Sequence, residues 1–534
     1  MPSPVLHFPR FPALLAAAIA LAAFLAPTGA TTPPAKAHVV VGFRSQAALA
    51  DALARFPGAE IVRRVPHMRT VEIEFDGDPR GFSSQPGIAF SHRPLLRTSK
   101  VEPALAAIFR PGVPYEWQYI ATRVNEVPEP VLRAASAIKI AVIDTGADVT
   151  HPDLAAKKPE TWDIVHRRPN VADKDGHGTF VSSLAAGSVT NNEGIAGFGG
   201  DAGLMMMKAV GKDDSFSDVD EAAAIVYAVD HGAKIINLSL GGEGTSKLEE
   251  RAILYAASHN VLLVAAAGNE YQEGNPIEYP AAALQPVGSK GQGGVGLSVG
   301  ATTLSGKRAS FSNTGSQISL VAPGEHVFGA VAARSSRAWW PRYALPGSLA
   351  GLYGWSSGTS FSSPEVAGAA ALVWAANPAL TAQQVAGILK ATASGHGAWN
   401  PRLGYGLIDV AGAVAAATGQ PIAPRVQAGA WLSVQRLHAR AARLAGPDRS
   451  LRRVRLAVHL RTSAPTVAPD WRVLSLELRR GRQWRRIART TTRFGGGIHW
   501  TVGLRPGRHL LRVVYRGRWD LHGAVRLKPI RVTK

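Results

Sequence analysis

The sequence predicts an α/β fold in which a mostly parallel β-sheet is covered by helices on both faces. Nearly unbroken apolar runs, such as Ile138–Ile143 and Val261–Ala267, are typical of strands that are buried on both sides. Segments with apolar residues at helical spacing, such as Val219–His231, alternate with these runs. Because such alternation is typical of parallel sheets, these patterns predict the architecture of the central region.

The length and composition indicate several domains and exclude chemistry that depends on cysteine. The chain has 534 residues, too many for one hydrophobic core, and about two to four domains are expected. It contains no cysteine, which excludes disulfides, thiolate zinc sites and a cysteine nucleophile. We expect a small α+β unit before the central region and a small all-β domain after it.

Residues 1–37 have the pattern of a signal peptide. Arg10 supplies a positive charge, Ala13–Ala26 is apolar, and Ala35-Lys36-Ala37 fits a cleavage site. The apolar stretch is short for a membrane span, although an uncleaved anchor is the alternative. No later stretch is long and apolar enough to span. We therefore expect a secreted protein (extracellular, periplasmic or at the cell surface) with no stable membrane span after signal removal.

The segment 38–105 predicts a small unit of its own, in which one helix is combined with several strands. The basic stretch Ser91–Lys100 near its end is interpreted as a linker. The strand, helix and two further strands are expected, in this order, at Val39–Phe43, Gln46–Phe56, Ile61–Val65 and Thr70–Phe75.

Three stretches place an acid, an imidazole and an alcohol at the ends of predicted elements. Asp144 follows a buried strand, His177 stands between two glycines at the head of an apolar helix, and Ser360 lies in a small-residue turn before another helix. A serine hydroxyl needs an adjacent base, and a histidine held by a carboxylate supplies one. Each stretch alone also fits a capped turn or a helix N-cap. Their combination indicates nucleophilic catalysis.

These stretches resemble the three catalytic blocks of the subtilisin-like serine proteases, the subtilases of the peptidase S8 family. The chain order Asp, His, Ser is that of subtilisin. The stretches that carry the resemblance are Ile138–Asp153, Asp173–Val181 and Gly358–Gly368.

The resemblance implies a subtilisin-like three-layer catalytic domain over residues 112–418. It implies Ser360 as the nucleophile, His177 as the general base and then acid, and Asp144 as the group that orients the imidazole. The segment 38–105 then resembles the propeptide of such proteases, an intramolecular inhibitor. A structural domain that stays attached is the alternative.

Further residues follow from the same resemblance. Asn269, at the end of the strand-like run Val261–Ala267, matches the oxyanion block and is expected to donate its side-chain amide. Ser239, Leu240 and Gly241 match the segment that pairs with a polypeptide substrate by strand addition.

Tyr279-Pro280 resembles the pair that follows the floor of the S1 pocket, the site for the substrate side chain before the scissile bond. Glu278 then lies at that floor and predicts a preference for Lys or Arg in this P1 position. A solvated loop carboxylate is the alternative for Glu278.

No cofactor is expected for catalysis, but a structural calcium ion is one interpretation of two loops. Asp153 matches the segment that supplies a calcium carboxylate in many subtilases, and Asn192 lies in a loop resembling the one that completes the site. A capping Asp and an ordinary turn are the alternative.

Residues 425–534 predict a basic, β-sandwich-like domain. The region 420–534 contains 26 Lys and Arg against four Asp and Glu, so it accounts for the net charge of +21 of the chain. Arginine alternates with apolar residues along its strand-like runs, as in Arg452–Leu456. This pattern indicates either contact with polyanions or a solvated surface.

Together these features predict a secreted serine endopeptidase that acts through an Asp-His-Ser triad and an acyl-enzyme. The alternative is an exported protein that binds polyanions or a surface on a protease scaffold.

Overall fold

The computed structural model describes three units of the chain and leaves the expected signal peptide outside the described residues. The described residues are 37–75, 78–99, 117–191, 194–211, 214–335, 342–343, 351–423, 430–437, 450–462, 473–492, 496–516 and 523–533.

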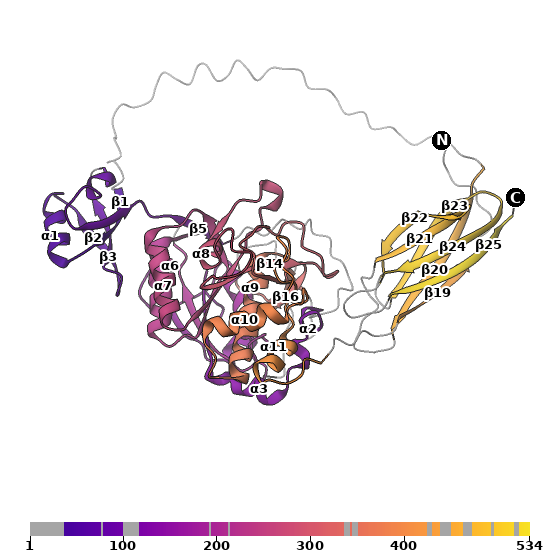
Figure 1. Cartoon of the computed structure of the whole chain (residues 1–534), viewed down its shortest axis with the longest axis horizontal. Coiled ribbons are helices and arrows are strands. Elements are labelled where there is room, and N and C mark those ends of the chain that lie inside the picture. Colours follow the sequence, from indigo (N-terminus) through magenta and orange to yellow (C-terminus); the bar gives the residue numbers. More distant parts are fainter. Residues whose placement is uncertain are drawn as a thin grey trace, which may run out of the picture.

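The N-terminal unit is a four-stranded antiparallel sheet in the order β2-β3-β1-β4, with helix α1 against it (Figure 1). Alternate residues of β1 and β3 bury their side chains with those of α1, as the period of two in these strands requires. The elements are β1 (Ala37–Phe43), α1 (Gln46–Ala54), β2 (Glu60–Val65), β3 (Thr70–Phe75), η1 (Pro79–Phe82) and β4 (Ile88–His92).

The central unit is built on a sheet whose seven described strands are all parallel, in the order β15-β14-β12-β10-β6-β8-β7. Its central strands consist almost entirely of buried apolar residues, as the sequence predicts. The strands are β6 (Lys139–Asp144), β7 (Glu160–Asp163), β8 (Gly203–Lys208), β10 (Ile235–Leu238), β12 (Leu262–Ala266), β14 (Gly296–Thr302) and β15 (Leu320–Pro323).

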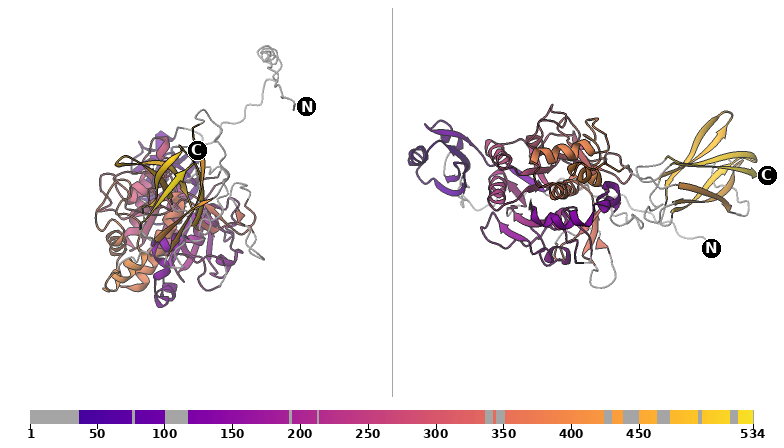
Figure 2. Two further views of the ribbon diagram at one scale, coloured as in Figure 1. Left: turned by 90° about the vertical axis from the view of Figure 1, so that its right-hand side faces the viewer. Right: turned by 60° about the horizontal axis from the view of Figure 1, so that its bottom comes forward.

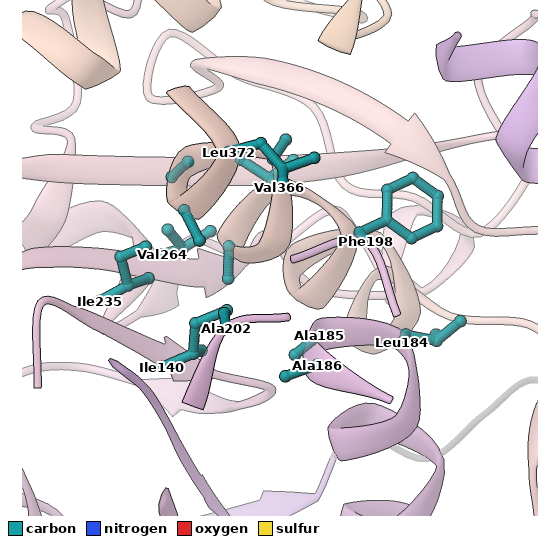
Figure 3. Packing of buried hydrophobic residues seen from close by; sticks show 14 of the residues in the cluster. Ile140, Leu184, Ala185, Ala186, Phe198, Ala202, Ile235, Val264, Val366 and Leu372 are labelled. Atoms are coloured by element: carbon teal, nitrogen blue, oxygen red, sulfur yellow. The ribbon is translucent and has the colours of Figure 1, made fainter. Parts of the chain in front are cut away.

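Helices cover both faces of this sheet, so each strand contributes to two cores. Ile140 and Val142 pack with α5 and α9, whereas Ala141 and Ile143 pack with α6 and α7. Figure 3 shows the first core, where Val366 and Leu372 of α9 lie over Val264 and Ile235. The α-helices are α2 (Trp117–Thr122), α3 (Glu129–Ala134), α4 (Pro152–Ala155), α5 (His177–Ala186), α6 (Asp218–Asp230), α7 (Lys247–Ser258), α8 (Ala281–Leu284), α9 (Thr359–Ala376), α10 (Ala382–Thr392) and α11 (Val410–Ala417).

Smaller antiparallel sheets and 3-10 turns complete this unit. One sheet has the order β13-β11-β5-β9, in which β5 is contributed by the end of the N-terminal unit, and the other has the order β16-β18-β17. The 3-10 turns are η2 (Val124–Glu126), η3 (Ala135–Ala137) and η4 (Tyr271–Glu273). The strands are β5 (Leu96–Ser99), β9 (Ser215–Ser217), β11 (Leu240–Glu243), β13 (Glu278–Tyr279), β16 (Val327–Ala330), β17 (Arg342–Tyr343) and β18 (Tyr353–Ser356).

The interpretation of Ser91–Lys100 as a linker was wrong for most of this stretch. Ser91 and His92 end strand β4, and Leu96–Ser99 form β5, which pairs with the central unit on both of its edges. Leu96–Ser99 form a strand because their main chain pairs with strands on both sides. The side-chain pattern of the stretch does not show this pairing.

The C-terminal unit is a β-sandwich of two sheets, β19-β20-β23 and β22-β21-β24-β25, around one apolar core (Figure 2). Five of its strands lie where the sequence places strand-like runs, and β19 and the arginine-rich β22 are additional. The strands are β19 (Ala430–Leu437), β20 (Arg452–Thr462), β21 (Val473–Arg480), β22 (Gln483–Thr491), β23 (Gly497–Leu504), β24 (Gly507–Tyr515) and β25 (Ala524–Val532).

The expected fold class is therefore confirmed: a three-layer α/β unit follows a small α+β unit and precedes an all-β unit. Within the described part of the chain, no helix has both the length and the apolar character needed to cross a bilayer.

Candidate active site

Three neighbouring strands of the parallel sheet end at one place and bring polar residues there. Strands β12, β10 and β6 are adjacent, and Asn269, Ser239 and Asp144 lie at or just beyond their carboxyl ends. In open parallel sheets this edge is where ligands bind, because the loops that leave the strands can diverge there. The parallel order thus gathers residues that lie up to 125 positions apart.

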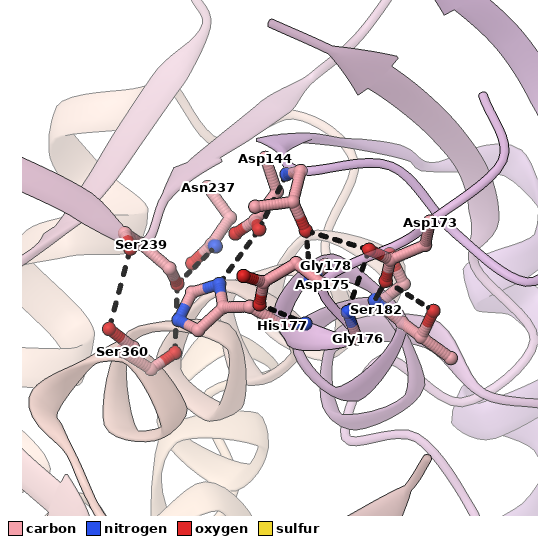
Figure 4. Close-up of polar contacts among 12 residues, drawn as sticks. Asp144, Asp173, Asp175, Gly176, His177, Gly178, Ser182, Asn237, Ser239 and Ser360 are labelled. Carbon is pink, nitrogen blue, oxygen red and sulfur yellow. Dashed lines mark hydrogen bonds and ion pairs between the residues drawn. The ribbon is translucent and has the colours of Figure 1, made fainter. Parts of the chain in front are cut away.

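The imidazole of His177 is bound to the carboxylate of Asp144. Nδ1 of His177 lies 2.7 Å from Oδ1 of Asp144, and both side chains are almost completely buried. The adjacent Gly178 allows this approach, because a Cβ there would lie 2.1 Å from the carbonyl oxygen of Gly146. The contact holds the imidazole with Nε2 on the side away from Asp144 (Figure 4).

A second buried acid, Asp173, shapes the loop that carries His177, and the sequence analysis missed it. Its Oδ1 accepts hydrogen bonds from Thr145 Oγ1 and the backbone N–H of Gly176, and its Oδ2 accepts two from Thr179. Burial raises the pKa of the Asp173 carboxyl. The sequence signal was an Asp four residues before the histidine, with a Thr two residues after it.

Ser360 lies in the first turn of α9, and a proline in that helix fixes its surroundings. Pro364 has no N–H to donate to the carbonyl of Ser360 four residues earlier. That carbonyl instead accepts a hydrogen bond of 2.8 Å from Ser239 Oγ. Ser239 Oγ in turn accepts one of 2.9 Å from the Asn237 amide. Strand β10 and helix α9 are thus joined directly behind the serine.

Ser360 lies beside the imidazole of His177, and its hydroxyl is directed to the end of strand β10. Its Oγ donates a long hydrogen bond of 3.3 Å to the carbonyl of Ser239. The next residue, Phe361, has its ring centroid 5.7 Å from that of His177. Figure 4 shows the imidazole between Asp144 and Ser360. The structure therefore brings together the acid, the imidazole and the alcohol.

The side chain of Asn269 is oriented so that its amide nitrogen has no partner. Its Oδ1 accepts hydrogen bonds from the backbone N–H (2.8 Å) and the hydroxyl (2.9 Å) of Thr359. Its Nδ2 is buried and has no hydrogen-bond partner among the described residues. A buried donor without an acceptor is costly unless another group takes its hydrogen bond. This donor is held through Thr359, the residue directly before Ser360.

Glu278 lies beside the loop that carries Asn269 and is only 4% exposed. A Cβ added to Gly268 would lie 2.7 Å from Cγ of Glu278, so the glutamate occupies the space next to Gly268. The peptide bond between Tyr279 and Pro280 is cis. The alternative of a solvated Glu278 does not agree with this burial.

The predicted calcium residues do not form an oxygen cage in the described part of the chain. Asp153 is buried, and its carboxylate accepts hydrogen bonds from the amide of Asn191, the backbone N–H of Ile195 and the hydroxyl of Tyr353. Hydrogen-bond donors thus surround the carboxylate where a cation would bind. A calcium site needs oxygen ligands there instead, so these residues do not fit calcium. Asn192 lies outside the described residues. No cluster of three or more His, Asp or Glu side chains among the described residues is placed to hold a metal ion.

A buried carboxylate–imidazole pair beside a serine at a helix N-terminus, on a doubly wound α/β unit, defines a serine hydrolase of the acyl-transfer class. Comparisons with known proteins specify the family. Residues 135–406, half of the chain, match the subtilase family.

Curated relatives and a solved structure agree with this match. The chain is 33% identical to a thermophilic serine proteinase of Bacillus sp. (strain AK1), over 53% of this chain and 65% of that protein. It is 30% identical to an alkaline protease of Alkalihalobacillus alcalophilus, over 72% of this chain and 94% of that protein. The crystal structure of fervidolysin from Fervidobacterium pennivorans, a keratinolytic enzyme related to subtilisin, has a TM-score of 0.60 and 18% identity, and the match covers 90% of this chain and 87% of that chain. At this identity it shows the fold alone.

The chain belongs to the subtilase family and is a subtilisin-type serine endopeptidase. Enzymes of this family hydrolyse polypeptides and need no cofactor for catalysis.

Proposed function

We propose that this endopeptidase cleaves peptide bonds through Asp144, His177 and Ser360, with Asn269 as a donor to the oxyanion, and that it is exported as a zymogen. The observation that carries the proposal is the 2.7 Å contact between Asp144 and His177 beside Ser360. If these buried polar side chains served packing alone, apolar residues would fill the same space at a lower cost in free energy.

In this proposal His177 Nε2 removes the proton from Ser360 as Oγ attacks the carbonyl carbon of the scissile bond. Asp144 holds the imidazole by Nδ1 and stabilises its positive charge. The amide of Asn269 and the backbone N–H of Ser360 donate to the carbonyl oxygen as it becomes negative. The proton on Nε2 then passes to the leaving amine. Water deacylates the serine by the same steps in reverse.

We further propose a preference for Lys or Arg at P1. The support is Glu278, whose buried side chain lies beside Gly268, the residue directly before Asn269. An incoming ammonium or guanidinium group neutralises a carboxylate that is removed from water, whereas a neutral side chain does not.

The N-terminal unit is proposed to act as the propeptide and inhibitor. Its strand β5 pairs antiparallel with Leu240 and Gly241 of β11 on one edge and with β9 on the other. A segment bound there by strand addition occupies the place of a substrate strand. Its sheet also contacts helix α6, because Arg63 is paired with Asp220 near the start of this helix and His67 with Asp230 at its end.

Export rests on the signal-like pattern of residues 1–37. The C-terminal sandwich is proposed to contact polyanions outside the cell. The hairpin of β21 and β22 exposes five arginines, namely Arg479, Arg480, Arg482, Arg485 and Arg486.

A fluorophosphonate probe tests the catalytic proposal, because it reacts only with an activated serine. The wild-type protein should be labelled, and Ser360→Ala should abolish labelling. Ser362→Ala is the matched control, since this hydroxyl lies two residues along the same helix and donates to backbone carbonyls of β15. Labelling that survives in Ser360→Ala, or that disappears equally in Ser362→Ala, would contradict the assignment.

A further inference from the structure

Strand β5 directs a charged side chain, that of Arg97, into the protein. Arg97 is 1% exposed and is among the largest fully buried side chains of the described chain, whereas its neighbour Leu96 is 61% exposed. Side chains alternate across a strand, so the pairing of β5 with β9 and β11 directs Arg97 inward. A strand that binds by its backbone thus inserts a guanidinium group into the catalytic unit.

Two buried glutamates receive this guanidinium group. Nη2 of Arg97 lies 2.6 Å from Oε2 of Glu249, and Nε lies 3.7 Å from Oε2 of Glu221. None of the three side chains is exposed to solvent. Glu249 lies in the first turn of α7 and Glu221 in the first turn of α6. The pocket is therefore formed by the beginnings of two helices that belong to the catalytic unit.

Contacts around the pocket hold the carboxylates and the strand in place. The hydroxyl of Thr245 donates to Oε2 of Glu249 at 3.0 Å. Asp218, at the start of α6, accepts a hydrogen bond of 2.9 Å from the backbone N–H of Leu95 and contacts His92 at 2.8 Å. Gly242 of β11 borders the guanidinium, since a Cβ there would lie 3.4 Å from Cδ of Arg97.

The electrostatics of this pocket require a cation. Burial and the charge of Glu249 raise the pKa of the Glu221 carboxyl well above its usual range, and burial also raises that of Glu249. Burial alone would lower the pKa of Arg97, but the charges of Glu221 and Glu249 raise it above its usual value. Two buried carboxylates without a cation would repel each other and remain desolvated. Arginine fits better than lysine because its Nε faces Glu221 while its Nη2 contacts Glu249, whereas lysine has a single ammonium group.

The strand register gives the position of Arg97 relative to the bond that is cut. Ser99 pairs with Leu240 and Thr98 with Gly241, so a peptide that continues in this register has its next residue opposite Ser239. The carbonyl of Ser239 accepts the hydroxyl of Ser360. The residue opposite Ser239 is thus P1, next to the nucleophile, and Ser99, Thr98 and Arg97 correspond to P2, P3 and P4.

We propose that Glu221 and Glu249 form a subsite that selects arginine four residues before the scissile bond, at P4 of polypeptide substrates. Arg97 of the N-terminal unit occupies this subsite in the structure. The inference rests on the proposed function, because the subsite is counted from Ser360. It adds a second basic requirement, remote from the reacting carbonyl, to the one proposed for Glu278.

Matched peptides test the subsite in the mature enzyme, which lacks the N-terminal unit and keeps the rest of the chain. Four peptides share Lys at P1 and carry Arg, Lys, citrulline or Leu at P4; citrulline has nearly the shape of Arg without its charge. We expect kcat/KM for Arg to exceed that for citrulline and Leu by about 100-fold, with Lys between them, because a neutral group leaves both acids unpaired. Glu249→Gln should reduce the ratio of Arg to citrulline to below about 10.

Glu250→Gln is the matched control, because Glu250 is the next residue of α7 and is paired at the surface with Lys247. It should leave the Arg to citrulline ratio unchanged. Cleavage of all four peptides at similar rates would overturn the subsite and leave the proposed catalysis intact. Cleavage of none of them, together with no fluorophosphonate labelling, would overturn the proposed function itself. The wild-type comparison decides the question even where a variant fails to fold.

Discussion

In the proposed function, each end of the substrate site contains buried acidic side chains that hold a basic one, and the two ends differ in where the basic side chain comes from. At the reaction end, Asp144 holds His177, and both residues belong to the catalytic unit. At the recognition end, Glu221 and Glu249 hold Arg97, which the N-terminal unit supplies. The first pair persists through every turnover. The second pair forms only when a bound strand supplies the arginine. The first pair therefore serves catalysis, and the second serves the selection of substrates.

The largest effect should appear at the reaction end. Asn269→Ala removes the amide donor, and we expect kcat to fall by about 10²–10³-fold while KM changes little, because a donor to the oxyanion acts in the transition state. The P4 preference should remain, because Asn269 does not touch the acidic pocket. Steady-state kinetics with the Arg and citrulline peptides measure both. A loss of kcat/KM carried mainly by KM would mean that Asn269 binds the ground state instead.

Glu278 lies beside Gly268, apart from both pairs, and should act on selection without acting on the triad. In Glu278→Gln the preference for Lys over Leu at P1 should fall by about 10- to 100-fold, because the buried charge that pairs with the ammonium group is removed. A peptide panel that varies only P1 measures this change. Glu243→Gln, an exposed acid of the paired strand β11, serves as the control. An enzyme that cleaves after Phe or Leu as well as after Lys would contradict the role of Glu278.

The recognition end should lose its selectivity on acidification. Because burial raises the pKa of Glu221 and Glu249, these carboxyls take up protons at a higher pH than exposed glutamates do. Protonation removes the negative charge that pairs with arginine. Asp218 also faces the pocket, and its negative charge acts in the same direction on Glu221.

The ratio of kcat/KM for the Arg and citrulline peptides should therefore decrease as the pH is lowered from about 9 to about 5. The ratio cancels any effect of pH on the catalytic step, because that step is the same for both peptides. A ratio independent of pH across this range would show that the glutamates do not supply the selectivity.

Glu365 extends the comparison to a buried acid that has no base. It lies on α9, and neither of its carboxylate oxygens has a hydrogen-bond partner among the described residues. Burial raises the pKa of Glu365 well above its usual range. The unfolded chain releases this proton at a lower pH than the folded one, so folding stability falls as the pH rises between the two pKa values.

Glu365→Gln should remove that loss. Its free energy of unfolding relative to the parent should rise with pH, by at most about 1.4 kcal/mol for each pH unit, because one proton is involved. Urea unfolding in the Ser360→Ala background, which avoids self-digestion, measures this difference from acid to neutral pH. A constant difference across the range would mean that Glu365 is ionised in the folded protein.

The sequence predicts the reaction end better than the recognition end, for a physical reason. Asp144, Asn269 and Ser360 each stand at the end of an apolar element, and parallel strands bring such ends together. Glu221 and Glu249 lie inside predicted helices 28 residues apart, where glutamate normally faces water. Only the packing of α6 beside α7 and the insertion of β5 make them neighbours. A local pattern carries no signal for such a pocket.

Strand β22 was missed for a related reason. Its run of arginines hides the alternation of a strand, because long side chains can lie along either face of an edge strand. The limits of the three expected units, 38–105, 112–418 and 425–534, remain predictions, as do the signal peptide and the polyanion contact.

The N-terminal sequence of the mature protein tests the central claim most directly, namely that β5 lies in the groove in the register of a substrate. In the sequence Ser99 is followed by Lys100 and Val101, so this register predicts cleavage of the bond after Lys100, with Arg97 at P4 and Lys at P1. The wild-type enzyme should begin at Val101, and Ser360→Ala should retain the uncut N-terminal unit. A mature protein that begins elsewhere, or a Ser360→Ala protein processed at the same bond when it is produced alone, would contradict the account.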